Sequence, residues 1–178
     1  MTEDVTDVAV VHGRFQPLHL GHLEYLLAGQ RLCRTLIVGI TNPDPWQVRD
    51  EDTAPHRGRP ESNPFTYYER MLMVEGALCD SGVAREAFRI VPFPHGFPER
   101  LRHYVPRDAS LLLTIYDAWG EEKLRRFREN GWRTRVLWRR TETVTSGTEI
   151  RDRIRDGRPW EHLVPPATVR VVKAGQVR

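Results

Sequence analysis

A single stretch near the N-terminus constrains the fold more than any other. Residues 8–12 form a short β-branched run that ends at Gly13, and residues 35–40 form a second such run. Between the two runs, leucines recur at the spacing of one helix face: Leu20, Leu23, Leu26 and Leu27. The order of strand, helix and strand predicts a β-α-β unit.

Three later runs continue this pattern. Residues 89–91, 111–115 and 135–138 have the character of buried strands, and the segments beside them have helical spacing. Alternating strands and helices predict an α/β fold, with a doubly wound parallel sheet of about five strands and helices on both faces. Because 178 residues suffice for one domain of ordinary size, we expect residues 1–178 to form a single domain.

Two other segments shape this domain. Residues 41–64 are rich in Pro, Gly, Asp and Arg and are too long for an ordinary connection, so they predict a lid over a site or a segment that is disordered without ligand. Thr66 then starts a helix, and Glu69 completes a capping box with it. Residues 147–178 predict a C-terminal helical extension, with one helix stopping near Gly157 and another starting at the prolines that follow.

Composition excludes several classes of protein. Apolar runs such as residues 111–113 are far too short to span a membrane, and the N-terminus has neither a cationic start nor the apolar stretch of a signal peptide. We therefore expect a cytoplasmic protein without membrane contact. Cys33 and Cys79 stand alone in apolar stretches, which argues against a disulfide framework or a cysteine-based zinc site and predicts that both are buried.

Arginine dominates the positive charge. It accounts for 25 of the 27 basic residues, and eleven arginines lie between residues 125 and 158. Such a cluster could bind nucleic acid, or a few of its members could bind the phosphate of a small ligand. Acidic residues are interleaved through the same segment, and mixed charge of this kind favours a solvated helix face. We expect small-molecule substrates and no nucleic acid, and a homo-oligomer stays open.

The strongest chemical signal lies between the first strand and the first helix. His19 and His22 are three residues apart at the helix start, so their side chains project from one face. Gly13 is expected to allow a tight turn there. At the carboxyl end of a parallel strand, two imidazoles and free backbone N–H groups can bind phosphoryl oxygens and stabilise the charge that develops during transfer. No third ligand accompanies the two histidines locally, so we expect no metal held by the protein alone.

A second group of this kind lies near the C-terminus. Ser146 and Thr148 place hydroxyl groups at a helix start, and Arg151 follows one turn later. This arrangement can bind an anion. The alternative is a plain helix cap, in which Ser146 and Glu149 form a capping box whatever binds there. Both interpretations can hold together.

These motifs resemble a known family. His19-Leu20-Gly21-His22 is similar to the signature of the nucleotidylyltransferase superfamily, which has a Rossmann-like fold. Within it, the chain resembles the archaeal-type nicotinamide mononucleotide adenylyltransferases. That resemblance rests on residues 13–17, residues 63–66 with Glu69-Arg70, the Ser-Gly-Thr-Glu-Ile-Arg motif at 146–151, and the tail at 160–166. It covers most of the chain, from the first strand to the last helix.

The resemblance implies roles for particular residues. His19, His22 and Arg151 are expected to be catalytic and to stabilise transition-state charge, with both histidines at least partly exposed. The residues expected to bind the nucleotide and its phosphates are Gly13, Arg14, Phe15, Gln16, Gly21, Ser146, Gly147 and Thr148. Mg²⁺ is expected to arrive with the triphosphate. The acceptor phosphate is already ionised and needs no general base.

The acceptor side departs from the family pattern. Residues 41–46, 91–98 and 114–120 differ from the loops that seat nicotinamide mononucleotide in the resembled enzymes. The candidate acceptor-binding residues are Trp46, Arg49, Phe93, Tyr116, Asp117 and Trp119. The aromatic residues among them could instead be packing anchors, and Asp117 could instead stabilise a turn.

Three functions follow from these observations. The first is a nucleotidylyltransferase that transfers a nucleotidyl group from a nucleoside triphosphate to a small acceptor phosphate and releases pyrophosphate. Its main form is an adenylyltransferase of NAD biosynthesis that joins ATP and nicotinamide mononucleotide, and the alternative form is a cytidylyltransferase acting on a small phosphate or phosphonate. The second is a nucleotide-binding regulator without turnover. The third is a nucleic-acid-binding module, which the interleaved acidic residues disfavour.

Overall fold

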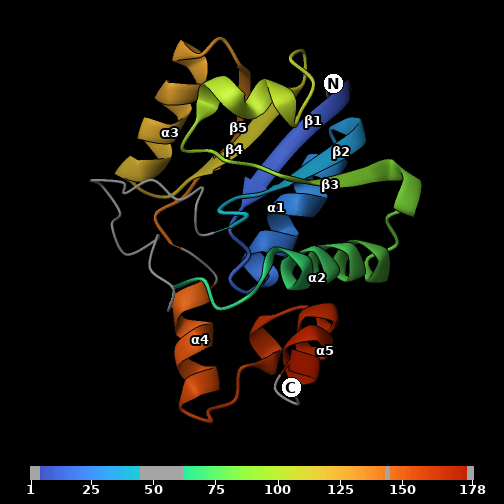
Figure 1. Cartoon of the computed structure of the whole chain (residues 1–178), viewed down its shortest axis with the longest axis vertical. Helices are drawn as coiled ribbons and strands as arrows, with labels where there is room; N and C mark the ends of the chain where they lie inside the picture. The colour runs from blue at the N-terminus through green and yellow to red at the C-terminus, as the bar shows by residue number, and fades with distance from the viewer. Residues whose placement is uncertain (1–4, 45–61, 143–144, 176–178) are drawn as a thin grey trace.

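A twisted parallel sheet lies at the centre of the molecule (Figure 1). The structure is a computed structural model that describes residues 5–44, 62–142 and 145–175. In this part of the chain the sheet has five strands in the order β3-β2-β1-β4-β5, and all neighbours are parallel. They are β1 (Thr6–Gly13), β2 (Cys33–Ile40), β3 (Phe88–Pro92), β4 (Ser110–Ile115) and β5 (Arg133–Arg139). Each of the five predicted runs is a strand, and the predicted Rossmann-like α/β class is confirmed.

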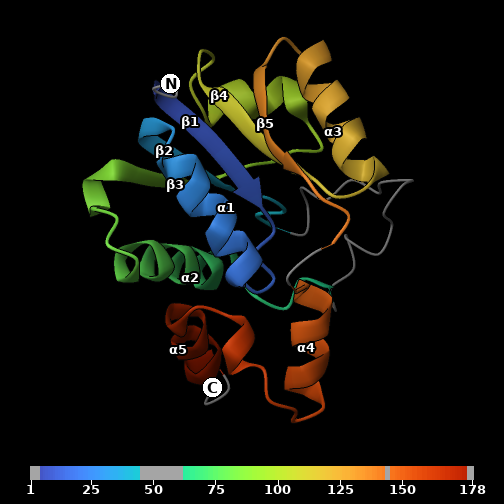
Figure 2. The ribbon, with the colours of Figure 1, turned by 180° about the vertical axis from the view of Figure 1, so that it is seen from behind.

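Helices cover both faces of the sheet. The α-helices are α1 (Leu20–Gln30), α2 (Tyr67–Asp80), α3 (Ala118–Glu129), α4 (Gly147–Arg155) and α5 (Pro166–Gly175). The 3₁₀ helices are η4 (Arg85–Ala87), η5 (Pro98–His103) and η6 (Glu161–Leu163). Helix α1 lies in front of the sheet in Figure 2, and η5 lies on the opposite face, in front of the sheet in Figure 1.

Two hydrophobic cores flank the sheet, and alternate residues of β1 belong to each. Ala9 and Val11 belong to the core shared with α1, α2 and α5, whereas Val10 belongs to the core shared with α3 and η5. This alternation is what a strand buried on both faces requires. The sheet therefore holds the end of β1 firmly between two packed layers.

The C-terminal helices complete the first of these cores. Trp160, Val164 and Ala167 are buried in it, and α5 lies beside α2 in both views (Figures 1 and 2). Gly76 of α2 permits this approach, because a Cβ there would stand 2.8 Å from the Cβ of Ala167. The Thr168 hydroxyl also donates a hydrogen bond to the Leu18 backbone oxygen (3.1 Å), which joins α5 to the loop before α1.

Two local expectations meet different outcomes. The capping box at the start of α2 is present, with Thr66 accepting from the Glu69 backbone N–H and the Glu69 carboxylate accepting from Thr66. Cys33 is buried as expected, but the expectation for Cys79 is wrong, because this residue lies on the exposed side of the last turn of α2.

Candidate active site

The loop that leaves β1 is shaped by one close contact. A Cβ on Gly13 would stand 2.8 Å from the Cε1 atom of Phe15, so only glycine leaves room for this buried ring. The turn itself is made at Phe15, whose φ is +52°. The expectation that Gly13 allows the turn is therefore wrong, because the left-handed backbone conformation lies at Phe15, two residues later. Glycine is needed at position 13 because it leaves room for the Phe15 ring.

His19 and His22 lie where this loop enters α1. His19 is the N-cap residue, and its Nδ1 accepts a hydrogen bond from the His22 backbone N–H (3.2 Å). The two rings are stacked, with centroids 3.6 Å apart and planes 20° apart. Because Nδ1 of His19 is an acceptor, the proton of its neutral imidazole lies on Nε2. The predicted meeting of the two side chains at one point is confirmed.

Burial keeps both imidazoles neutral near pH 7. It lowers the pKa of His19 from 6.5 to about 4. Burial, His19 and Arg14 hold the pKa of His22 well below its ordinary value. His19 is only 8% exposed, so the expectation of a partly exposed ring is wrong for this residue, whereas His22 is half-buried. The Nδ1 atom of His22 is buried without a hydrogen-bond partner. The pair can therefore donate hydrogen bonds to a phosphoryl oxygen but does not carry a fixed charge.

Helix α4 brings the second predicted motif to the same loop. Arg151 donates from Nη1 to the Gln16 backbone oxygen (2.6 Å) and from Nη2 to Thr148 Oγ1 (3.1 Å). A Cβ on Gly147 would stand 2.7 Å from the Gln16 oxygen, so glycine allows the start of α4 to meet the loop. The structure thus brings together two segments that lie at opposite ends of the chain.

The start of α4 is capped only in part as expected. Ser146 Oγ accepts a hydrogen bond from the Glu149 backbone N–H (3.2 Å). The reciprocal half of the predicted capping box is replaced, because the Glu149 carboxylate pairs with Arg153 at 2.8 Å. The N–H groups in the first turn of α4 remain a potential anion site.

Gln16 holds the loop in place from the other side. Its side-chain amide donates to the Phe65 backbone oxygen (2.9 Å) and accepts from the Phe65 N–H (3.0 Å). This amide is therefore occupied and connects the loop to the entry of α2, while the expectation that Gln16 contributes to phosphate binding stays a prediction.

Sequence reasoning missed the structural role of Arg70. This residue is 2% exposed, and its guanidinium donates to backbone oxygens in the loops after β1 and β2: Arg14 at 3.0 Å, Thr41 at 2.8 Å and Asn42 at 2.8 Å. Burial lowers its pKa to about 10, which keeps it charged. Its position one turn before Val74, on the buried face of α2, was a signal that could have identified it.

The proposed acceptor residues have packing and capping contacts. Phe93 is fully buried and stacks on His12, and Trp119 is buried with its ring edge-to-face with His95. Tyr116 accepts a hydrogen bond from Trp138. Asp117 caps α3 by accepting from the Gly120 N–H. Phe93 therefore offers no free ring face, and the cap at Asp117 matches the turn-stabilising alternative. Trp46 and Arg49 lie outside the described residues.

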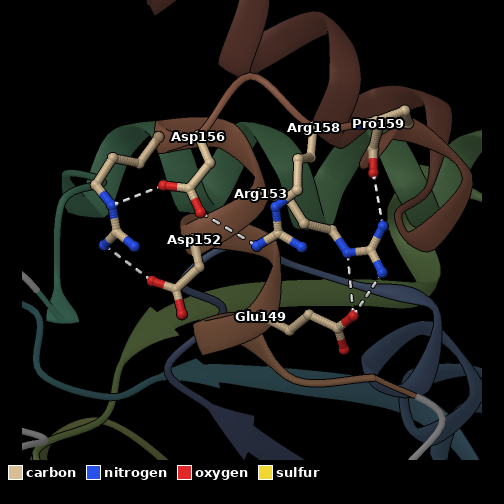
Figure 3. A network of polar contacts seen from close by, with 7 residues as sticks. Glu149, Asp152, Arg153, Asp156, Arg158 and Pro159 are labelled. Atoms are coloured by element: carbon tan, nitrogen blue, oxygen red, sulfur yellow. Dashed lines mark hydrogen bonds and ion pairs between the residues drawn. The ribbon is translucent and has the colours of Figure 1, made fainter.

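The arginine-rich C-terminal half forms ion pairs on helix surfaces. On and just after α4, Glu149 pairs with Arg153, and Asp156 pairs with Arg158 (Figure 3). Arg155 pairs with Asp152 at 2.9 Å. Arg125 of α3 similarly pairs with acidic residues of its own helix. The interleaved charges thus neutralise one another locally, as the solvated-face interpretation predicts.

Two further observations concern metal binding and membrane-spanning helices. No cluster of three or more His, Cys, Asp or Glu side chains that could hold a metal ion occurs within residues 5–44, 62–142 and 145–175. Among these same residues, no helix is long and apolar enough to cross a membrane.

The loop that leaves β1 leads into a pair of stacked histidines at the start of α1, and the start of α4 is bonded to the same loop. Residues 10–153 match the family described as cytidylyltransferase-like. The chain belongs to this family and is a nucleotidyltransferase.

The chain is similar in sequence or fold to several known nucleotidyltransferases. The chain is 64% identical over 171 residues to the phosphonoformate cytidylyltransferase of Streptomyces viridochromogenes, covering 96% of this chain and 93% of that protein. It is 31% identical to the nicotinamide-nucleotide adenylyltransferase of Pyrococcus furiosus, covering 90% of this chain and 80% of that protein. A bifunctional NMN adenylyltransferase/ADP ribose pyrophosphatase from Francisella tularensis shares the fold, with a TM-score of 0.68 and 18% identity over 97% of this chain and 50% of that one.

Proposed function

We propose that this chain is a cytidylyltransferase that transfers CMP from CTP to an oxygen of a small phosphonate and releases pyrophosphate. The observation that carries the proposal is the 64% identity to a phosphonoformate cytidylyltransferase over nearly the whole of both chains. The adenylyltransferase relatives are half as similar, and the acceptor loops depart from their pattern. The cytidylyltransferase alternative therefore replaces the NMN-specific reading as the leading function.

The reaction needs positioning more than acid–base chemistry. An ionised phosphonate oxygen attacks the α-phosphorus of CTP in line. The new P–O bond forms as the bond between the α-phosphorus and its bridging oxygen breaks, and pyrophosphate leaves with that electron pair. Because the nucleophile is already deprotonated, no residue has to remove a proton, and catalysis comes from alignment and from stabilising negative charge.

The site residues fit these requirements. The Nε2–H of His19 and the imidazole of His22 act as neutral hydrogen-bond donors to oxygens of the transferring phosphoryl group. Ser146, Thr148 and the N–H groups of the first turn of α4 bind the triphosphate, and Arg151 adds a positive charge beside them. Gly147 and Gln16 act through the backbone, because they set the distance between the loop and α4.

Mg²⁺ remains part of the proposal as a companion of the triphosphate. Hard oxygen ligands on phosphate groups can hold this ion with few protein ligands, which fits a site built from histidine, arginine and backbone N–H groups. When bound, it would neutralise part of the triphosphate charge.

Pyrophosphate release tests this function directly. Purified enzyme with Mg²⁺ is given CTP, ATP, GTP or UTP in turn, together with phosphonoformate, methylphosphonate or nicotinamide mononucleotide. We expect release with CTP and phosphonoformate and formation of the mixed anhydride in mass spectra. Release only with ATP and nicotinamide mononucleotide would refute the proposal and restore the adenylyltransferase function. Binding of triphosphate without release in any pair would support a regulator instead.

A further inference from the structure

The imidazole of a buried histidine beside the active-site loop has no hydrogen-bond partner. His12, in β1, is 6% exposed, and neither Nδ1 nor Nε2 makes a hydrogen bond. Its ring stacks on Phe93, with centroids 4.9 Å apart, and meets the edge of Phe127 at 5.4 Å. A buried polar side chain without a partner is costly, and such groups are often kept for a ligand. If packing were the only requirement at this position, leucine or valine would fill it without the free-energy cost of burying an unpaired polar group.

A lysine and a second histidine lie near this imidazole. Lys123 lies on α3 one turn before Phe127, which contacts His12, and His95 follows β3 two residues after Phe93. Both act electrostatically on His12, and together with burial they hold its pKa well below the ordinary value. Trp119 lies one turn before Lys123 on α3, and its ring contacts His95, so α3 and the segment after β3 are in contact here. We name His12, His95 and Lys123 the His12 cluster.

The His12 cluster lies at the catalytic edge of the sheet. His12 immediately precedes Gly13, where the loop to His19 begins, and His95 follows the carboxyl end of β3. Small ligands of open parallel sheets bind at this edge. His12 packs on the side covered by α3, so the His12 cluster faces a different side of the sheet from the core beneath α1. The stacked histidines and the His12 cluster thus both lie near the end of β1, at the edge of the sheet where such ligands bind.

We propose that the His12 cluster binds a second anionic group of the acceptor, the carboxylate of a carboxy-phosphonate, while the phosphonate group is presented to the nucleotide. This inference rests on the proposed function and names the determinant of its acceptor class. The neutral imidazole of His12 donates a hydrogen bond to a carboxylate oxygen, and Lys123 balances its charge. Stacking on Phe93 fixes the ring plane. A pyridinium ring, which is positively charged, is disfavoured by the positive charge of Lys123.

The test compares two acceptors that differ by the carboxylate. For wild-type enzyme with CTP, kcat/KM is measured by pyrophosphate release with phosphonoformate and with methylphosphonate. We expect wild type to prefer phosphonoformate. Lys123→Met keeps the aliphatic stem and His12→Phe keeps the ring stack, and each should reduce this preference about 10- to 100-fold while the KM for CTP changes by less than about twofold. Arg128→Met removes an exposed cation of the same helix and should leave the preference unchanged.

The outcomes separate this inference from the function on which it rests. Variants that fold, remain active and retain the wild-type preference would overturn the His12 cluster as the subsite and leave the cytidylyltransferase intact. If His12→Phe does not fold, Lys123→Met still tests the inference through its acceptor preference, because Lys123 is only half-buried. A wild-type enzyme that releases pyrophosphate from CTP with neither acceptor would refute the proposed function and this inference together.

Discussion

Arg151 of α4 donates a 2.6 Å hydrogen bond to the backbone oxygen of Gln16, a residue 135 positions earlier in the chain. The bond joins α4 to the loop that leads into α1, and the starts of both helices are proposed to bind the triphosphate. It also orients the guanidinium, because the other end of the group bonds Thr148 Oγ1. A planar fork with several fixed donors can hold this geometry, which an ammonium group cannot reproduce.

Arg151→Lys should therefore lower turnover while the fold survives. We expect kcat for pyrophosphate release to fall about 10- to 100-fold, because lysine keeps the charge but loses the paired contacts. Arg153→Lys is the matched control on the same helix, since Arg153 pairs with Glu149 on its surface, and its turnover should stay near that of wild type. Equal rates in the two variants would remove Arg151 from the catalytic group.

His22→Ala should reduce turnover more strongly. Loss of one positioned donor to a developing oxyanion lowers kcat by about 100- to 1,000-fold in comparable sites. The variant also removes the ring that stacks on His19. Steady-state pyrophosphate release measures the effect, and circular dichroism with thermal unfolding confirms that the protein is folded. Turnover near that of wild type would contradict the proposed role.

Arg70→Met should destabilise the protein without touching substrate. The buried guanidinium satisfies backbone oxygens of Arg14, Thr41 and Asn42, and methionine leaves them unpaired. We expect the free energy of unfolding to drop by about 3 kcal/mol or more, measured by urea denaturation. Arg155→Met provides the comparison, because the Arg155 side chain is 70% exposed. This substitution should change the free energy of unfolding by less than about 0.5 kcal/mol. Similar losses in both variants would contradict the role of Arg70 in joining the loops.

Acid should destabilise the fold through the buried histidines. The pKa of His19 is about 4 in the folded protein and 6.5 when unperturbed, so the unfolded chain binds more protons between these values. Stability therefore falls as pH drops from about 6.5 toward 4. His19→Asn keeps an N-cap for α1 and should lose about 2 kcal/mol less than wild type between pH 7.5 and pH 5 in urea unfolding. His22 and His12 add to the loss in both proteins. An equal pH dependence would show that His19 titrates normally in the folded state.

The fold was accessible from sequence because its elements have strong local patterns. Residues 8–12 and 35–40 are β-branched runs too short for helices, and both are strands of a sheet buried on two faces. The paired histidines were also accessible, because residues three apart at a helix start share a face whatever the surrounding fold is. The meeting of their rings is confirmed by the stacking of His19 on His22.

The remainder depends on contacts between distant segments, which spacing does not encode. The Gln16 side chain bonds the backbone of Phe65 only because folding brings their two loops together. In the same way, the His12 ring is buried only because Phe93 and Phe127, which are distant in sequence, pack against it. Cys79 shows the same limit on a helix, since its apolar neighbours suggested burial, but the last turn of α2 leaves it exposed.

The bonds from Arg70 have a consequence for how such an enzyme can change. The oxygens that Arg70 holds belong to the main chain, and every amino acid supplies the same oxygen there. Substitutions in the side chains of these loops therefore leave the anchoring intact. The side chains proposed to select the acceptor can therefore be exchanged, in evolution or by engineering, while the residues proposed to bind phosphate keep their positions.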